Sequence, residues 1–75
     1  MKAPLYKIRA LSITETEAKE TEWVTSKADF AHAWYNKVCK YYVNKKLIGN
    51  VELLKVNYSS NGIKDLTRIE RFTQE

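Results

Sequence analysis

The sequence predicts an α+β domain of order ββαββ, in which two hairpins form one antiparallel sheet and a central amphipathic helix packs on one face of it. Three observations carry this prediction. Residues 4–26 hold two β-type segments around a polar turn, residues 27–46 contain no Gly or Pro, and residues 50–72 hold two more β-type segments around an Asn-Gly pair. The chain is short enough to form one domain over residues 1–75.

The first hairpin is predicted from alternation. In PLYKIRALSI, Tyr6 and Ile8 point to one side of an extended chain, while Lys7 and Arg9 point to the other. The stretch TETEA then forms a polar turn, and KETEWVTS returns as a second strand with Trp23 on its apolar side. We therefore expect the basic pair and the apolar side chains on opposite faces of the sheet.

The central segment is predicted to be a helix from Lys27 to about Lys46. Ser26 followed by Asp29 is a capping-box pattern, which also places an acid at the positive end of the helix. Two lysines occupy the last turn, where cations are favoured, and Gly49 follows as a stop signal.

Rings and lysines alternate in the stretch HAWYNKVCKYYVNKK, yet they separate on a helix. At about 100° per residue, Phe30, Trp34 and Tyr41 fall within about 40° of one another, and the lysines lie mainly on the other side. We expect these three rings to seal the core, so that the helix is no continuous stacking platform. The half-exposed edge of the stripe is expected to hold Tyr35, Cys39 and Tyr42.

The second hairpin is predicted from NVELLKVNY and IKDLTRIERF, which flank the stretch SSNG. Asn61 and Gly62 supply the positive φ angles of a two-residue type I′ turn. The apolar residues of the last segment are spaced by three, however, which also fits a short helix over residues 63–72.

A turn at Asn61 and Gly62 sets the register of this hairpin. The expected cross-strand pairs are Glu52 with Arg71 and Leu54 with Ile69. The same register brings Lys55 directly opposite Arg68, and like charges so placed are destabilising. Either a binding face that needs positive charge explains this opposition, or the register differs by one residue.

The sheet face turned away from the helix is predicted to be both basic and apolar. Its expected basic residues are Lys7, Arg9, Lys55 and Arg68. Its expected apolar residues are Leu11, Ile13, Leu53, Leu66 and Phe72. A single-layer sheet rarely leaves so much apolar surface in water, so we expect a second copy or another partner to cover it.

The sequence contains no recognisable catalytic or ligand-binding motif. His32 is the only histidine and falls on the polar side of the helix, two turns from the single cysteine, Cys39. Gly-rich phosphate loops, nucleophile elbows and zinc-ligand spacings do not occur. We therefore expect no enzymatic activity, no cofactor and no metal. One cysteine and the lack of a long apolar run favour the cytoplasm and no membrane partner.

The net charge of +4 favours an acidic partner, although a merely solvated lysine-rich face remains an alternative. Two classes of function follow: a protein that occupies another protein, and a binder of RNA or DNA, with RNA preferred. The first ranks higher, since exposed aromatic platforms are not expected to be left over. The candidate binding residues are Lys7, Arg9, Lys37, Lys40, Lys45, Lys46, Lys55 and Arg68.

The stretch EWVTSKADFAHAWYNKVCKYYVNKKLIGNVELLKV resembles, in its arrangement, the small early proteins of T4-like bacteriophages. Among these are antitoxins that neutralise RNA-cleaving toxins of the host. The shared features are a hairpin, a capped aromatic-rich helix that ends in NKK, and a following strand. The resemblance implies a non-enzymatic inhibitor or antitoxin that occupies a host protein or an RNA in the host cytoplasm.

Overall fold

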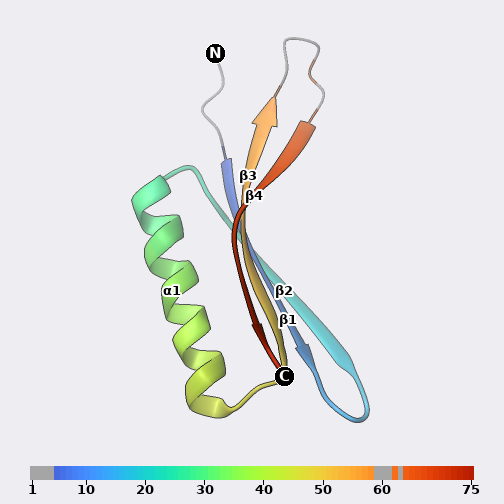
Figure 1. Cartoon of the computed structure of the whole chain (residues 1–75). Helices are drawn as coiled ribbons and strands as arrows, with labels where there is room; N and C mark the ends of the chain where they lie inside the picture. Colours follow the sequence, from blue (N-terminus) through green and yellow to red (C-terminus); the bar gives the residue numbers. More distant parts are fainter. Residues whose placement is uncertain (1–4, 59–61, 63) are drawn as a thin grey trace.

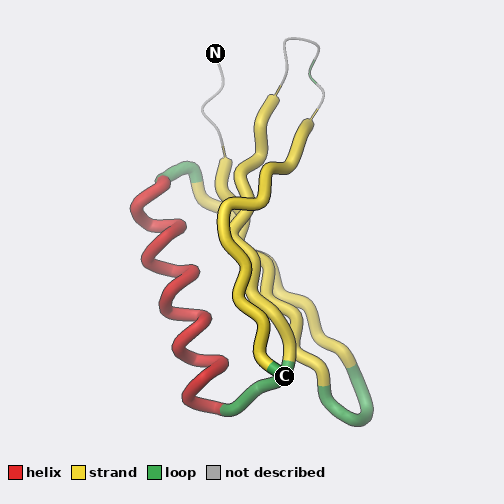
Figure 2. The backbone as a smooth tube through the Cα atoms, viewed as in Figure 1, coloured by secondary structure: helices red, strands yellow, loops and turns green. Residues whose placement is uncertain are grey.

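The computed structural model describes residues 5–58, 62 and 64–75 and has the predicted ββαββ order (Figure 1). The elements are β1 (Leu5–Ile13), β2 (Ala18–Thr25), α1 (Ala28–Lys45), β3 (Gly49–Tyr58) and β4 (Lys64–Gln74). All neighbouring strands are antiparallel, in the order β2-β1-β3-β4. The α+β prediction is confirmed, with one helix lying along one face of the sheet (Figure 2). Within the described ranges no helix is long and apolar enough to cross a membrane.

The core lies between α1 and the two central strands. Ile8 of β1 pairs with Leu53 of β3, and both side chains are fully buried. Central strands are covered by a neighbour on each side, so their apolar residues gain the most from burial beneath the helix. The residues of this core are Ile8, Ala10, Ala31, Tyr35, Val38, Tyr42, Val51 and Leu53.

The helix presents a different part of its apolar stripe from the part that we predicted. Phe30 and Tyr41 are each 54% exposed, and Trp34 is only partly buried. The buried residues are instead Ala31, Tyr35, Val38 and Tyr42. Small Ala31 and Val38 let the helix backbone approach the sheet closely, which three large rings in the same position would prevent. The helix is therefore rotated, and rings expected in the core stand at its exposed edge.

Both ends of α1 carry the predicted charges, with Asp29 in the first turn and Lys45 in the last turn, but the predicted capping box and glycine stop are not used. The N-cap residue is Lys27, whose side chain makes no capping hydrogen bond, so the capping box of Ser26 and Asp29 does not form. At the other end Lys46 adopts the left-handed conformation (φ 55°), and Leu47 N–H donates to the carbonyl of Tyr42 at 2.9 Å. This is a Schellman-type end, usually built with glycine at the left-handed position.

Gly49 has a role other than stopping the helix. Its φ of 150° is one that side chains rarely adopt, and a Cβ atom there would lie 1.8 Å from the carbonyl oxygen of Leu11. Glycine therefore lets β3 begin against the backbone of β1.

The last segment is a strand and not a short helix, but its register shifts by one residue between Leu53 and Leu54. Glu52 lies opposite Arg71, as predicted. The other predicted pair is wrong, because Ile69 is an extra residue in β4. The observed pairs beyond it are Leu54 with Arg68 and Lys55 with Thr67. The predicted turn falls mostly on residues outside the described ranges.

The bulge removes the predicted opposition of Lys55 and Arg68. Arg68 now lies 3.6 Å from Glu52, and alternation along β3 places Lys55 on the helix side together with Leu53. Phe72 also packs against the core beneath the helix. The prediction that Lys55, Leu53 and Phe72 face away from the helix is therefore wrong.

Candidate functional site

The structure divides the predicted binding residues between two surfaces. We call the sheet face turned away from α1 the open face. There Lys7 lies 3.4 Å from Glu22, and Arg9 Nε lies 3.3 Å from the same carboxylate, although its N–H is not aligned for a hydrogen bond. Arg68 likewise lies near Glu52, so Lys7, Arg9 and Arg68 are each paired with an acid. Arg71, which is opposite Glu52 in the sheet, lies within ion-pair distance of no described carboxylate.

Glu22 illustrates the electrostatics of the open face. Partial burial acts to raise the pKa of this carboxyl, but hydrogen bonds that include one from Lys7, and the charges of Lys7 and Arg9, lower it overall. The carboxylate therefore stays ionised and neutralises its neighbours. An anionic partner on this face would have to compete with Glu22.

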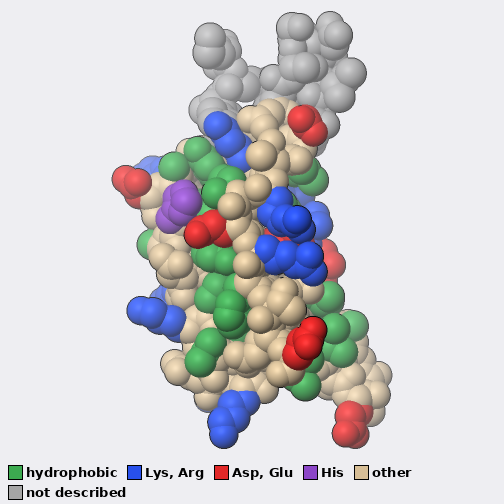
Figure 3. Space-filling model, in the orientation of Figure 1, with side chains coloured by type: hydrophobic (Ala, Val, Ile, Leu, Met, Phe, Trp, Pro, Cys, Tyr) green, Lys and Arg blue, Asp and Glu red, His purple; other side chains and the backbone are tan. Residues whose placement is uncertain are grey.

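The basic residues of the helix are arranged differently. Lys37, Lys40, Lys45 and Lys46 are all exposed, and no described carboxylate lies within ion-pair distance of them. Figure 3 shows basic side chains that project from the α1 side, separate from the cluster over β4. The prediction that Lys37 and Lys40 lie off the buried stripe is confirmed by their exposure.

Aromatic rings at the edge of the core gather beside Lys37. Phe30 stacks on Trp34 with ring centroids 6.1 Å apart and an interplanar angle of 6°. Trp23 of β2 meets Trp34 edge-on at 5.7 Å. The ammonium of Lys37 lies 5.1 Å from the centroid of Trp34, within cation–π distance. A cluster of rings on α1 and β2 is thus joined to an unpaired positive charge.

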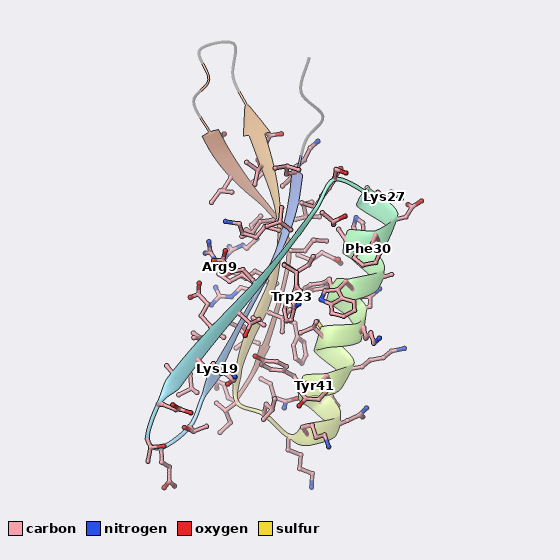
Figure 4. All side chains as sticks on the ribbon, turned by 180° about the vertical axis from the view of Figure 1, so that it is seen from behind. Arg9, Lys19, Trp23, Lys27, Phe30 and Tyr41 are labelled. Carbon is pink, nitrogen blue, oxygen red and sulfur yellow. The ribbon has the colours of Figure 1, made fainter. Side chains whose placement is uncertain are left out.

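A groove of about 420 Å³ adjoins these rings. It runs between α1 and β2, and Figure 4 shows Trp23 and Tyr41 in this space, with Arg9 on the opposite side of the sheet. Two of its lining residues are lysines and none is acidic. The lining residues are Ala10, Ser12, Lys19, Thr21, Trp23, Trp34, Lys37, Val38, Tyr41, Tyr42 and Leu47.

The groove and its rim form one site, which we call the lysine–aromatic surface. It consists of Lys19, Trp23, Phe30, Trp34, Lys37 and Tyr41. The indole N–H of Trp34 is buried and has no hydrogen-bond acceptor in the described part of the chain. Its position therefore depends on contacts with the neighbouring rings.

Of these residues only Lys37 belongs to the predicted site. Lys19 was missed because it lies in a segment rich in glutamate. A signal for it exists, since Lys19, Thr21 and Trp23 are spaced by two residues and therefore share one face of β2. This is the face on which Trp23 was expected to meet the apolar side of the sheet. Phe30 and Tyr41 could not be found in this way, because the rotation of the helix exposes them.

A second cluster of titratable groups lies between α1 and β4. His32 Nδ1 is 3.8 Å from a carboxylate oxygen of Glu70, a neighbour that the sequence did not indicate, and Figure 3 shows the histidine beside an acidic side chain. Burial raises the pKa of the Cys39 thiol and of the Tyr35 hydroxyl, which disfavours a thiolate nucleophile. The described residues contain no group of three or more side chains that could hold a metal ion.

Comparison with known proteins finds no matching family model, no matching curated protein and no matching solved structure. The resemblance to small early proteins of T4-like phages therefore stays a prediction.

Proposed function

We propose that this chain is a non-enzymatic protein that binds single-stranded nucleic acid, with RNA preferred over DNA, through its lysine–aromatic surface. One observation carries the proposal: exposed aromatic rings lie beside lysines that no described acid neutralises. Phe30 and Tyr41 are each about half exposed, and Lys19 and Lys37 line the adjoining groove.

Single strands suit this combination of groups. Their bases can stack on protein rings, a contact worth about 1–3 kcal/mol per base, and the phosphates bind nearby cations. The open face is less suited to a nucleic acid, because Lys7, Arg9 and Arg68 there already lie within ion-pair distance of glutamates. The rotation of the helix also removes the reason for ranking nucleic acid second, since rings are left over after the core is filled.

The test is the binding of a labelled ten-nucleotide RNA, measured by fluorescence anisotropy over a range of salt concentrations. The double substitution Lys19→Glu with Lys37→Glu should weaken binding at least tenfold and lower the log-log salt slope by roughly one to two units. The corresponding DNA strand and an RNA duplex are measured beside it, and the duplex should bind more weakly.

The matched control is Lys40→Glu with Lys55→Glu, which changes the net charge equally. Lys55 is far from the groove: it lies opposite Tyr6 in the sheet, whereas Lys19 lies opposite Ser12, about 20 Å further along β1. The control should lose much less affinity, and both variants should melt like the parent. Equal losses in the two variants, or no binding by the parent at low salt, would refute the proposal.

A protein partner, whether a host protein or a second copy in the host cytoplasm, is the second candidate. It is favoured by apolar side chains of the open face, where Val24 is 57% exposed and Leu66 is 48% exposed. Leu54, which lies between Lys7 and Arg68 on the same face, is already buried within this chain. It therefore offers little apolar surface to a partner. If the RNA fails to bind, sedimentation above the monomer mass of 8.8 kDa would move this candidate to first place.

A further inference from the structure

We infer that the groove between α1 and β2 is a pocket for a single unstacked nucleobase of the bound strand, with the adjoining phosphate held by Lys19 or Lys37. The inference rests on the proposed function and adds to it, because it assigns one base to the groove while the other bases lie on the exposed rings.

The size and walls of the groove suit one planar ring. Its volume of about 420 Å³ lies near the lower end of the range for small-molecule pockets, which is about 300–1,000 Å³. Trp23, Trp34 and Tyr41 supply aromatic walls from both β2 and α1. A flat aromatic group can stack on such walls.

The polar groups of the lining indicate how an occupant would be recognised. Ser12 and Thr21 line the groove, and the hydroxyl of such a residue can either donate or accept a hydrogen bond. Such groups can form hydrogen bonds with the edges of different bases, so we expect little sequence preference at this position.

Charge favours a base that is attached to phosphate over other planar groups. The two lysines of the lining face no described acid, and none of the lining residues is acidic. The Lys37 ammonium rests over the Trp34 ring on a long flexible stem, from which it can reach an arriving phosphate. An aromatic amino acid side chain would fill the walls but leave both cations unused.

The chain itself provides the reporter for this pocket. It contains two tryptophans, and both line the groove. A base that enters should change their emission, while anisotropy of a labelled RNA reports binding anywhere on the protein. Loss of the anisotropy signal would count against the proposed function. Anisotropy without a change in tryptophan emission would overturn this inference alone.

The variant Thr21→Phe fills the groove from β2 and should abolish the change in tryptophan emission and weaken RNA binding about tenfold. The matched control, Val24→Phe, adds a ring to the same strand on the open face and should bind like the parent. If Thr21→Phe keeps the full emission change, the base does not enter the groove.

A second measurement does not depend on the folding of a variant. Adenosine 5′-monophosphate should change the tryptophan emission of the unmodified protein at high concentration, and ribose 5-phosphate should not. An equal response to both compounds, or a response to neither, would overturn the assignment of a base to the groove.

Discussion

The two faces of the sheet are built from the same strands and carry similar residue types, yet their side chains have different roles. On the face beneath α1, Leu53 is fully buried, whereas Leu66 on the open face is 48% exposed. The difference extends to charge, because Lys7, Arg9 and Arg68 of the open face are paired with glutamates. The lysines of α1 and Lys19 have no such partner among the described residues. Whether a basic residue is free to bind an anionic partner thus depends on the face of the molecule on which it lies.

A single residue decides much of this division at the β3–β4 end. The bulge at Ile69 keeps Arg68 on the open face near Glu52 and leaves Lys55 opposite Thr67. Without it, the uninterrupted register would place two cations side by side. The bulge therefore keeps Lys55 and Arg68 from lying side by side.

The largest effect is expected from the core beneath the helix. Leu53→Ala should lower the free energy of unfolding by about 2–5 kcal/mol, because the cavity it leaves lies between β1, β4 and α1. Chemical denaturation measures the loss. The matched substitution Leu66→Ala, on the open face, should cost about 0.5 kcal/mol. Similar losses at the two sites would mean that a partner or second copy buries the open face.

A smaller effect should follow from deletions in β4. Removing Ile69 should abolish the bulge and keep Leu54 opposite Arg68, whereas removing Thr67 should restore the register with Lys55 opposite Arg68. The second deletion should be less stable than the first by about 0.2–1 kcal/mol, the usual cost of like charges placed directly across a sheet. Thermal melting compares them, and the reverse order would contradict a destabilising effect of the two cations.

The smallest effect is expected from the ion pairs of the open face. Glu22→Gln should lower stability at neutral pH by under about 1 kcal/mol, as is usual for exposed pairs. The pKa of Glu22 is lowered in the folded protein, so its contribution is present above the pKa of an unfolded glutamate and is lost as pH falls below about 4. Melting curves of the two proteins should therefore converge in acid; a constant difference would contradict the pairing.

The sequence by itself predicted the number and order of the elements, and the type of every element except the last, which it left open between a strand and a short helix. Alternation in β1, the absence of Gly and Pro from residues 27–46, and β-type residues around Asn61-Gly62 are local signals, and local signals suffice for elements of this length. The sequence also indicated that Lys37 and Lys40 are exposed, because on a helix they fall outside the apolar stripe.

Tertiary structure alone decided which part of the helix stripe is buried and where the register shifts. The apolar arc is wider than the sheet can cover, so close packing of Ala31 and Val38 fixed the rotation and left Phe30 and Tyr41 outside. A one-residue shift in β4 changes side-chain facing without any change in composition, so the pattern that predicts a strand does not reveal it. The lysine–aromatic surface depends on that rotation, which is why its residues, unlike the elements that carry them, could not be predicted together.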